Sequence, residues 1–199
     1  MSVTIFFEGG GDKETTQSKC RRGLSIYCAK VNPKFRRLRV VASGGREQTF
    51  EKFNIALRNS RVGETVALLV DSEGPVTKSS AAEHLRETDR WEFANLPNHH
   101  AFLMVQCMES WFMADRQSLA AFYDGGFLLN SLPGSSTSIE SIRKQSVHSA
   151  LKRATSNTRT KGEYQKIDHG SALLAMIDPA KVEDASPHAK RFNDFLRSR

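Results

Sequence analysis

The chain has 199 residues, of which 39% are hydrophobic and 26% are charged, and its formal net charge is +7. This composition is typical of a globular protein of one domain and excludes wholesale disorder. No apolar run approaches the roughly 20 residues that a membrane helix needs, and the first residues do not resemble a signal peptide, so no membrane partner is expected. The segment from Thr15 to Arg46 carries nine Lys or Arg and no acid. Two interpretations of this basic segment stay open, a surface that binds a nucleic acid or another phosphate partner and a merely solvated surface.

Four short apolar runs predict buried strands. They are rich in Val, Ile, Leu or Phe and lack the alternation of a half-exposed strand, which is typical of a parallel sheet covered on both faces. The four runs are Val3–Phe7, Leu38–Ala42, Thr65–Val70 and Ala101–Val105.

Helical patterns lie between and after these strands. Apolar stripes predict helices over Cys20–Val31 and Phe50–Leu57, a weaker one over Lys78–Glu87, and a strong one over Glu109–Tyr123. Strands that alternate with helices predict an α/β fold, here a mainly parallel Rossmann-like sheet of about four strands flanked by helices.

The last third of the chain is predicted to be helical. Thr137-x-x-Glu140 has capping-box spacing and predicts a helix that continues to Ala154. Two shorter helices are expected near Ser171–Ile177 and Pro187–Leu196, the second with Ser186 as its N-cap. We therefore expect an α/β body over residues 1–130 and a helical extension over 131–199 that packs on the body.

Acidic residues follow two of the predicted strands. Glu8 comes directly after the first strand, and Asp71 and Glu73 come after the third. If the strands are parallel, these side chains meet at the carboxyl edge of the sheet, where open α/β sheets bind ligands. Oxygen donors without sulfur or imidazole suit Mg²⁺ or Mn²⁺. The alternative is an ordinary loop with helix-capping acids.

Glycines and an arginine follow the same strand ends. Gly10, within a run of three glycines, and Gly45 would let the backbone approach a phosphate, and Arg46 would clamp it. The alternative for the glycine run is a flexible turn, because the run lacks P-loop and dinucleotide-binding spacing. Arg36 and Arg37, in the basic segment, are further candidates for phosphate contacts.

These motifs resemble the TOPRIM superfamily. Phe7-Glu8-Gly9-x-x-Asp12 after one strand and Leu69-Val70-Asp71-Ser72-Glu73 after another are similar to its Glu and its DxD motif. Within the superfamily the chain resembles the bacterial family of domain of unknown function 4276. The resemblance rests on Gly44-Gly45-Arg46, Val105–Asp115, Tyr164-x-Lys166 and Ile177-Asp178-Pro179 as well.

The resemblance implies a TOPRIM-type fold and a Mg²⁺- or Mn²⁺-dependent nuclease that cuts DNA or RNA. Glu8 and Asp71 match the family's first acid and the first Asp of DxD, whereas Glu73 replaces the second Asp and lengthens that ligand by one methylene. The resemblance also implies a role as the nuclease effector of an anti-phage system that works with an ATPase partner. The rival hypothesis is a non-catalytic module that binds a nucleotide, a nucleic acid or a partner protein.

Two further residues have alternative interpretations. Glu109 opens a predicted helix, where it is equally well explained as a metal ligand or as a carboxylate that complements the helix dipole. Lys166 is the candidate for a positive group beside the scissile phosphate, and the alternative is a solvated surface lysine. The three cysteines form no CxxC pair, which indicates a reducing, cytoplasmic location and argues against structural zinc. The sequence leaves open whether the chain forms a homodimer.

Overall fold

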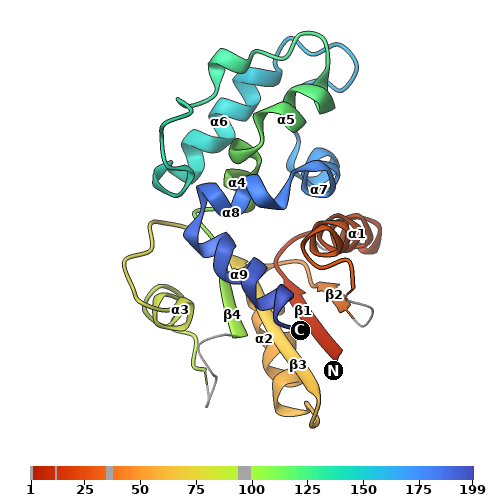
Figure 1. The fold of residues 1–199 in the computed structure, drawn as a ribbon, viewed down its shortest axis with the longest axis vertical. Helices are drawn as coiled ribbons and strands as arrows, with labels where there is room; N and C mark the ends of the chain where they lie inside the picture. Colours follow the sequence, from red (N-terminus) through yellow and green to blue (C-terminus); the bar gives the residue numbers. More distant parts are fainter. Residues whose placement is uncertain (1, 12, 35–37, 94–99) are drawn as a thin grey trace.

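The computed structural model describes residues 2–11, 13–34, 38–93 and 100–199, and these residues contain a parallel four-stranded sheet, in the lower half of Figure 1. Its order is β2-β1-β3-β4, and every neighbouring pair is parallel. The strands are β1 (Ser2–Phe7), β2 (Leu38–Ala42), β3 (Glu64–Asp71) and β4 (Ala101–Met104). The predicted α/β class and the parallel sheet are therefore confirmed.

The register brings the ends of the strands to one level. Phe7 lies opposite both Ala42 and Leu69, and Asp71 lies opposite Met104. The residues that follow β1, β2, β3 and β4 therefore leave the sheet along the same edge, as the parallel arrangement predicts.

Helices cover both faces of the sheet, which explains the continuous apolar strands. On one face Ile5 and Phe7 join a core with α1 (Glu14–Val31) and α9 (Pro187–Arg197). On the other face Phe6, Leu68 and Val70 pack with α2 (Arg46–Arg58) and α3 (Ala81–Asp89). The remaining helices lie above the sheet in Figure 1. They are α4 (Met108–Ala114), α5 (Arg116–Tyr123), α6 (Lys144–Thr155), α7 (Lys166–Met176) and α8 (Pro179–Ala185), with short 3₁₀ turns η2 (Leu129–Ser131) and η3 (Ile139–Ser141).

The C-terminal helices pack directly on the N-terminal part. Helices α1 and α7 lie side by side (Figure 1), and a Cβ atom at Gly23 would come within 2.4 Å of the Ser171 carbonyl oxygen. Lys30 Nζ donates to the carbonyls of Met176 and Ile177 at the end of α7, at 2.8 and 3.1 Å. One hydrophobic core therefore contains residues from β1 through α9.

The predicted helix over Glu109–Tyr123 is wrong in its length, because Asp115 divides it into α4 and α5. The Asp115 carboxylate accepts from the Ser118 amide and hydroxyl as the N-cap of α5. It also accepts from Lys181 Nζ at 2.7 Å and from the Asp178 amide at 3.0 Å. Partners more than 60 positions along the chain thus hold the carboxylate that ends one helix and begins the next.

The predicted capping box at Thr137 and Glu140 is also wrong. Glu140 lies in η3, and its carboxylate accepts from the Ser186 hydroxyl and from the amide and ring of His188 at the start of α9. Helix α6 begins only at Lys144. Ser186 is the N-cap of α9 as predicted, and it accepts from the Ala189 amide at 3.0 Å. Helix α7 begins at Lys166, earlier than expected, and α8 was not predicted.

None of the helices in the described part of the chain combines the length and the apolar character that crossing a membrane requires.

Candidate active site

Three carboxylates meet at the carboxyl edge of the sheet. Glu8 follows β1, Asp71 ends the adjacent strand β3, and Glu73 follows two residues later. One oxygen of each lies within 4.8 Å of the other two. The proximity that the motif spacing predicts is therefore present in the structure.

Glu73 is held in an unusual backbone conformation. Its φ of 63° lies in the left-handed region that residues other than glycine rarely adopt. Its amide donates to the Gln106 carbonyl at 3.0 Å, which ties the loop after β3 to the chain after β4. Backbone strain of this kind is concentrated at functional sites, where the surrounding structure maintains it.

The glycine loops pack closely beside the carboxylates. Gly9 and Gly44 exchange two backbone hydrogen bonds of 3.2 Å, which clamp the loops after β1 and β2 together. Gly10 has a φ of 89°, and a Cβ atom there would lie 2.6 Å from Gln17 Cα in α1. Gly10 is therefore needed for close packing, whereas a Cβ atom at Gly45, the N-cap of α2, would meet nothing within 4 Å.

Arg46 holds two of the site's segments in place. Its guanidinium donates to both Asp89 oxygens at 2.6 and 2.9 Å, to Glu8 Oε2 at 2.9 Å and to the Asp71 carbonyl at 2.7 Å. It also lies over the ring of Trp91, at 5.0 Å from the centroid. In this conformation Arg46 orients Glu8 and offers no free fork for the phosphate that the sequence analysis assigned to it.

Asp71 is the most buried member of the group. Its side chain accepts from the Met108 amide at 2.8 Å, and its other oxygen lies 3.3 Å from Lys144 Nζ and 3.8 Å from Lys166 Nζ. The pKa of Asp71 is raised to about 7, chiefly by burial and also by the charges of Glu8 and Glu109, and this value already includes the opposing effect of Lys166 and Lys144. Despite the two nearby lysines, the folded protein therefore disfavours the charged form of Asp71.

Two lysines from the C-terminal helices approach the carboxylates. Lys144 Nζ in α6 lies 2.5 Å from Glu73 Oε1, and Lys166, the first residue of α7, lies between Asp71 and Glu109. The resemblance indicated Lys166, whose side chain is 48% exposed. Nothing in the local sequence marked Lys144, because a lysine at the start of a helix is commonplace.

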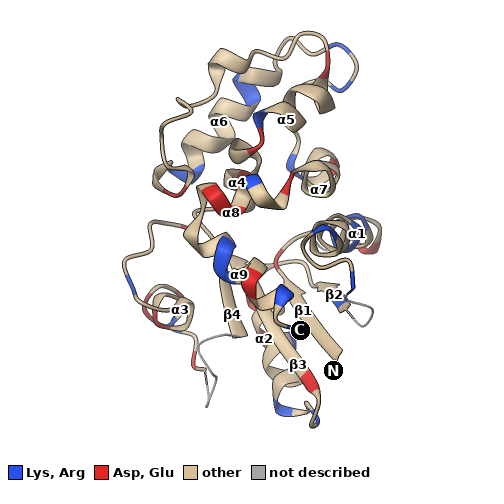
Figure 2. Cartoon of the chain, viewed as in Figure 1, with Lys and Arg blue, Asp and Glu red and all other residues tan. Residues whose placement is uncertain are grey.

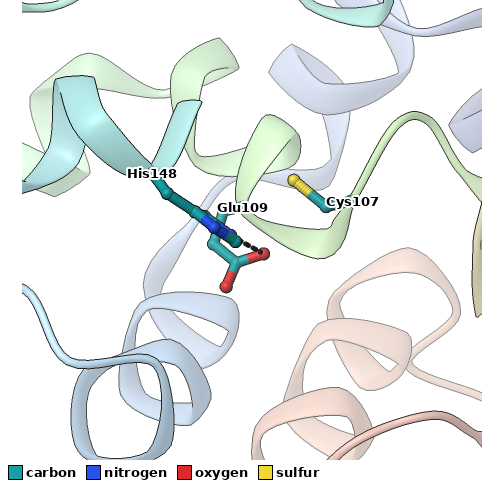
Figure 3. A group of neighbouring side chains, drawn as sticks. All are labelled: Cys107, Glu109 and His148. Atoms are coloured by element: carbon teal, nitrogen blue, oxygen red, sulfur yellow. Dashed lines mark ion pairs between the residues drawn. The ribbon is translucent and has the colours of Figure 1, made fainter. Parts of the chain in front are cut away.

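Glu109 belongs to a second group, on the far side of Lys166. Tyr164 donates to Glu109 Oε1 at 3.0 Å, and Lys166 Nζ lies 3.7 Å from the same oxygen. Although burial acts to raise the pKa of Glu109, the neighbouring His148 and Lys166 bring it down to about 2. One ligand atom each of Cys107, Glu109 and His148 lies within 4.8 Å of the others (Figure 3), and no local sequence motif marks Cys107 or His148.

The basic segment contributes to the fold as well as to the surface. Figure 2 shows basic residues along α1, where Lys19 pairs with Asp168 at 3.3 Å and Lys30 caps α7. Asp12, Arg36 and Arg37, which were predicted from motif and charge, lie outside the described residues. Their expected phosphate contacts stay predictions.

Comparison with known proteins identifies the family. The sequence profile described as domain of unknown function (DUF4276) matches residues 7–197. The chain belongs to this family. Among solved structures, the DUF4276 chain is similar to the C-terminal region of the Burkholderia pseudomallei OLD protein, with 12% identity, a TM-score of 0.48 and coverage of 98% of this chain and 97% of that one. No curated protein matches the DUF4276 chain.

Proposed function

We propose that this protein is a Mg²⁺- or Mn²⁺-dependent nuclease of the TOPRIM type. The observation that carries the proposal is the group of three carboxylates, with oxygens within 4.8 Å of one another, at the ligand-binding edge of a parallel sheet. Their donors are oxygens only, which fits these hard cations. The pKa of Asp71 is raised chiefly by burial, and a divalent ion bound to this carboxylate would favour its charged form.

The surrounding residues have separable roles in such a reaction. A divalent ion, when bound, would polarise the phosphodiester and activate a water molecule. Arg46 fixes the orientation of Glu8, and the Met108 amide fixes that of Asp71. Lys166, half exposed beside Asp71, is placed to stabilise the negative charge that builds on the phosphate during attack.

One observation favours the rival function, a non-catalytic binding module. Lys144 Nζ lies 2.5 Å from Glu73 and 3.3 Å from Asp71, so an ammonium group already occupies part of the space between two would-be ligands. A site neutralised in this way would bind a partner or a phosphate without cleaving it. Catalysis requires Lys144 to give way to the metal or to the substrate.

The test is cleavage of supercoiled plasmid and of total RNA by the full chain, each with Mg²⁺, with Mn²⁺ or with a chelator. We expect metal-dependent cleavage that Asp71→Asn lowers at least about 100-fold, equal to about 2.7 kcal/mol of transition-state stabilisation. Glu51→Gln, which removes an exposed carboxylate on α2, is the matched control and should leave the rate unchanged. Cleavage that survives Asp71→Asn contradicts the proposal, and binding without cleavage supports the module.

The same proposal includes the biological setting that the family resemblance implies, a cytoplasmic nuclease that works with an ATPase partner in phage defence. In cells that carry the protein with its natural neighbouring genes, we expect reduced phage plating that Asp71→Asn abolishes. The ATPase should copurify with the wild-type chain. Plating that is equal for the wild type and the variant would refute this setting and leave the nuclease assay unaffected.

A further inference from the structure

Cys107, Glu109 and His148 form a group whose chemistry differs from that of the three carboxylates. Cys107 is the N-cap of α4, Glu109 is the second residue of that helix, and His148 lies on α6. One ligand atom of each lies within 4.8 Å of the others. In Figure 3 the His148 ring and the Glu109 carboxylate point toward one another, with the Cys107 side chain beside them.

Two buried atoms of this group lack hydrogen bonds among the described residues. Glu109 Oε2 and His148 Nε2 are both inaccessible and form an ion pair with each other at 3.4 Å, outside hydrogen-bond geometry (Figure 3). Glu109 is 0% exposed, so its Oε2 has the ion pair with His148 but no hydrogen bond, where most buried carboxylate oxygens have one. A cation between these atoms would satisfy both.

The spacing of these atoms fits one ion. With bonds of about 2.0–2.2 Å, two N or O ligands of a tetrahedral Zn²⁺ lie about 3.4 Å apart. Glu109 Oε2 and His148 Nε2 already have that separation. Cys107 Sγ lies within 4.8 Å of both atoms and needs to approach by at most about 1 Å to complete a three-ligand site with a water molecule in the fourth position.

The charges and the donor types also fit. A thiolate and a carboxylate together neutralise a divalent ion, which suits a fully buried Cys107 and Glu109. Sulfur and imidazole select Zn²⁺ and similar ions, whereas the oxygen-only group selects Mg²⁺ or Mn²⁺. Lys166, which contacts the opposite oxygen of Glu109 at 3.7 Å and Asp71 at 3.8 Å, lies between the two groups.

We propose that Cys107, Glu109 and His148 form a second cation site, specific for a soft divalent ion such as Zn²⁺ and separate from the carboxylate group. On binding, the Cys107 thiol loses its proton to solvent and a metal–sulfur bond forms, with no oxidation or reduction. The His148 side chain is 33% exposed, so an ion reaches the site from its side. The inference does not depend on nuclease activity.

The test is a titration of the full chain with Co²⁺, a spectroscopic substitute for Zn²⁺, in excess Mg²⁺. We expect a thiolate-to-cobalt charge-transfer band that saturates at one equivalent and is displaced by Zn²⁺. Cys107→Ser should abolish the band, and His148→Gln, at a partly exposed position, should weaken Co²⁺ binding at least about tenfold. Cys20→Ser and Asp71→Asn, at another buried thiol and in the carboxylate group, should retain the band.

Two outcomes would overturn the proposal. One is the absence of a thiolate band at stoichiometric Co²⁺ in a folded wild-type protein. The other is a band that Cys107→Ser retains or that Cys20→Ser removes, which would place the metal at a different thiol. Circular dichroism of each variant establishes whether it is folded. If Cys107→Ser does not fold, His148→Gln tests the site independently.

Discussion

Asp71→Asn should stabilise the metal-free protein at pH 8. The Asp71 side chain is 2% exposed, and its pKa rises from 3.8 to about 7 in the folded state, because burial and neighbouring acids disfavour its charge. Above pH 7 the wild type must hold this charge, whereas the unfolded chain holds it at no cost. Asparagine has the same shape and keeps the oxygen that accepts from the Met108 amide.

The size of the effect follows from the shift in pKa. A rise from 3.8 to about 7 corresponds to about 4 kcal/mol at pH 8, and it already includes the attraction of Lys144 and Lys166. The asparagine amide would face those two ammonium groups, which reduces the gain, so we expect about 2 kcal/mol. For a chain of this length that is a rise in Tm of about 4–8 °C.

The measurement is thermal or urea unfolding of chelator-treated wild type and variant at pH 8, 5 and 4. A folded-state pKa above the unfolded value means that the folded wild type binds the extra proton between pH 4 and 7, so its stability falls as pH rises through that range. The gain from Asp71→Asn should therefore shrink at pH 5 and nearly vanish at pH 4. Mg²⁺ should stabilise the wild type alone, by about 2.7 kcal/mol at 100 times Kd. A variant less stable than the wild type at pH 8, or a gain independent of pH, would refute the reasoning.

Glu109→Gln should act in the opposite direction, costing about 3 kcal/mol at pH 7, because a pKa of about 2 in place of 4.5 means that the folded state favours this charge. That stability is present above pH 4.5 and is lost as pH falls toward 2. Urea unfolding at pH 3 should therefore show about half of the loss of unfolding free energy that the variant has at pH 7. A loss that is the same at both pH values would contradict the lowered pKa of Glu109. Gly10→Ala should cost about 1–3 kcal/mol and weaken Mg²⁺ binding, because its Cβ atom would meet Gln17 Cα at 2.6 Å at a positive φ. Gly11→Ala, with a positive φ and nothing within 4 Å, is the matched control in the same unfolding and Mg²⁺ titrations, and equal losses for the two variants would exclude the packing argument.

The sheet and its acids could be predicted because each depends on local sequence. Continuous apolar runs such as Leu68–Val70 are buried on both faces, and in a parallel sheet their ends share one edge. Glu8 and Asp71 follow such runs directly, so their proximity followed once the strands were placed. Arg46 lies at the predicted edge of the sheet, but it pairs with Asp89 and Glu8 and does not have the free guanidinium expected for binding a phosphate. The sequence could not show this, because Asp89 lies 43 positions away on α3.

The rest of the site depends on tertiary packing that leaves no local pattern. Lys144, His148 and Tyr164 reach the carboxylates only because α6 and the chain before α7 pack against α4. The break at Asp115 has the same origin, since the carboxylate is shared by α5 and α8. Periodicity describes one helix at a time and cannot show which side chains of separate helices meet.

The order in which the chain is synthesised gives the packing of α7 on α1 a consequence for folding in the cell. At roughly 5–20 residues per second, Lys166 is added about 5–20 s after Asp71. During that interval the nascent strands expose the sheet face that α9 later covers, and the grouped acids lack both ammonium partners until Lys144 is added and lack Lys166 until its end. The segment that ends at Asp71 is thus expected to remain incompletely folded until α6, α7 and α9 have left the ribosome, and the site forms only after they have.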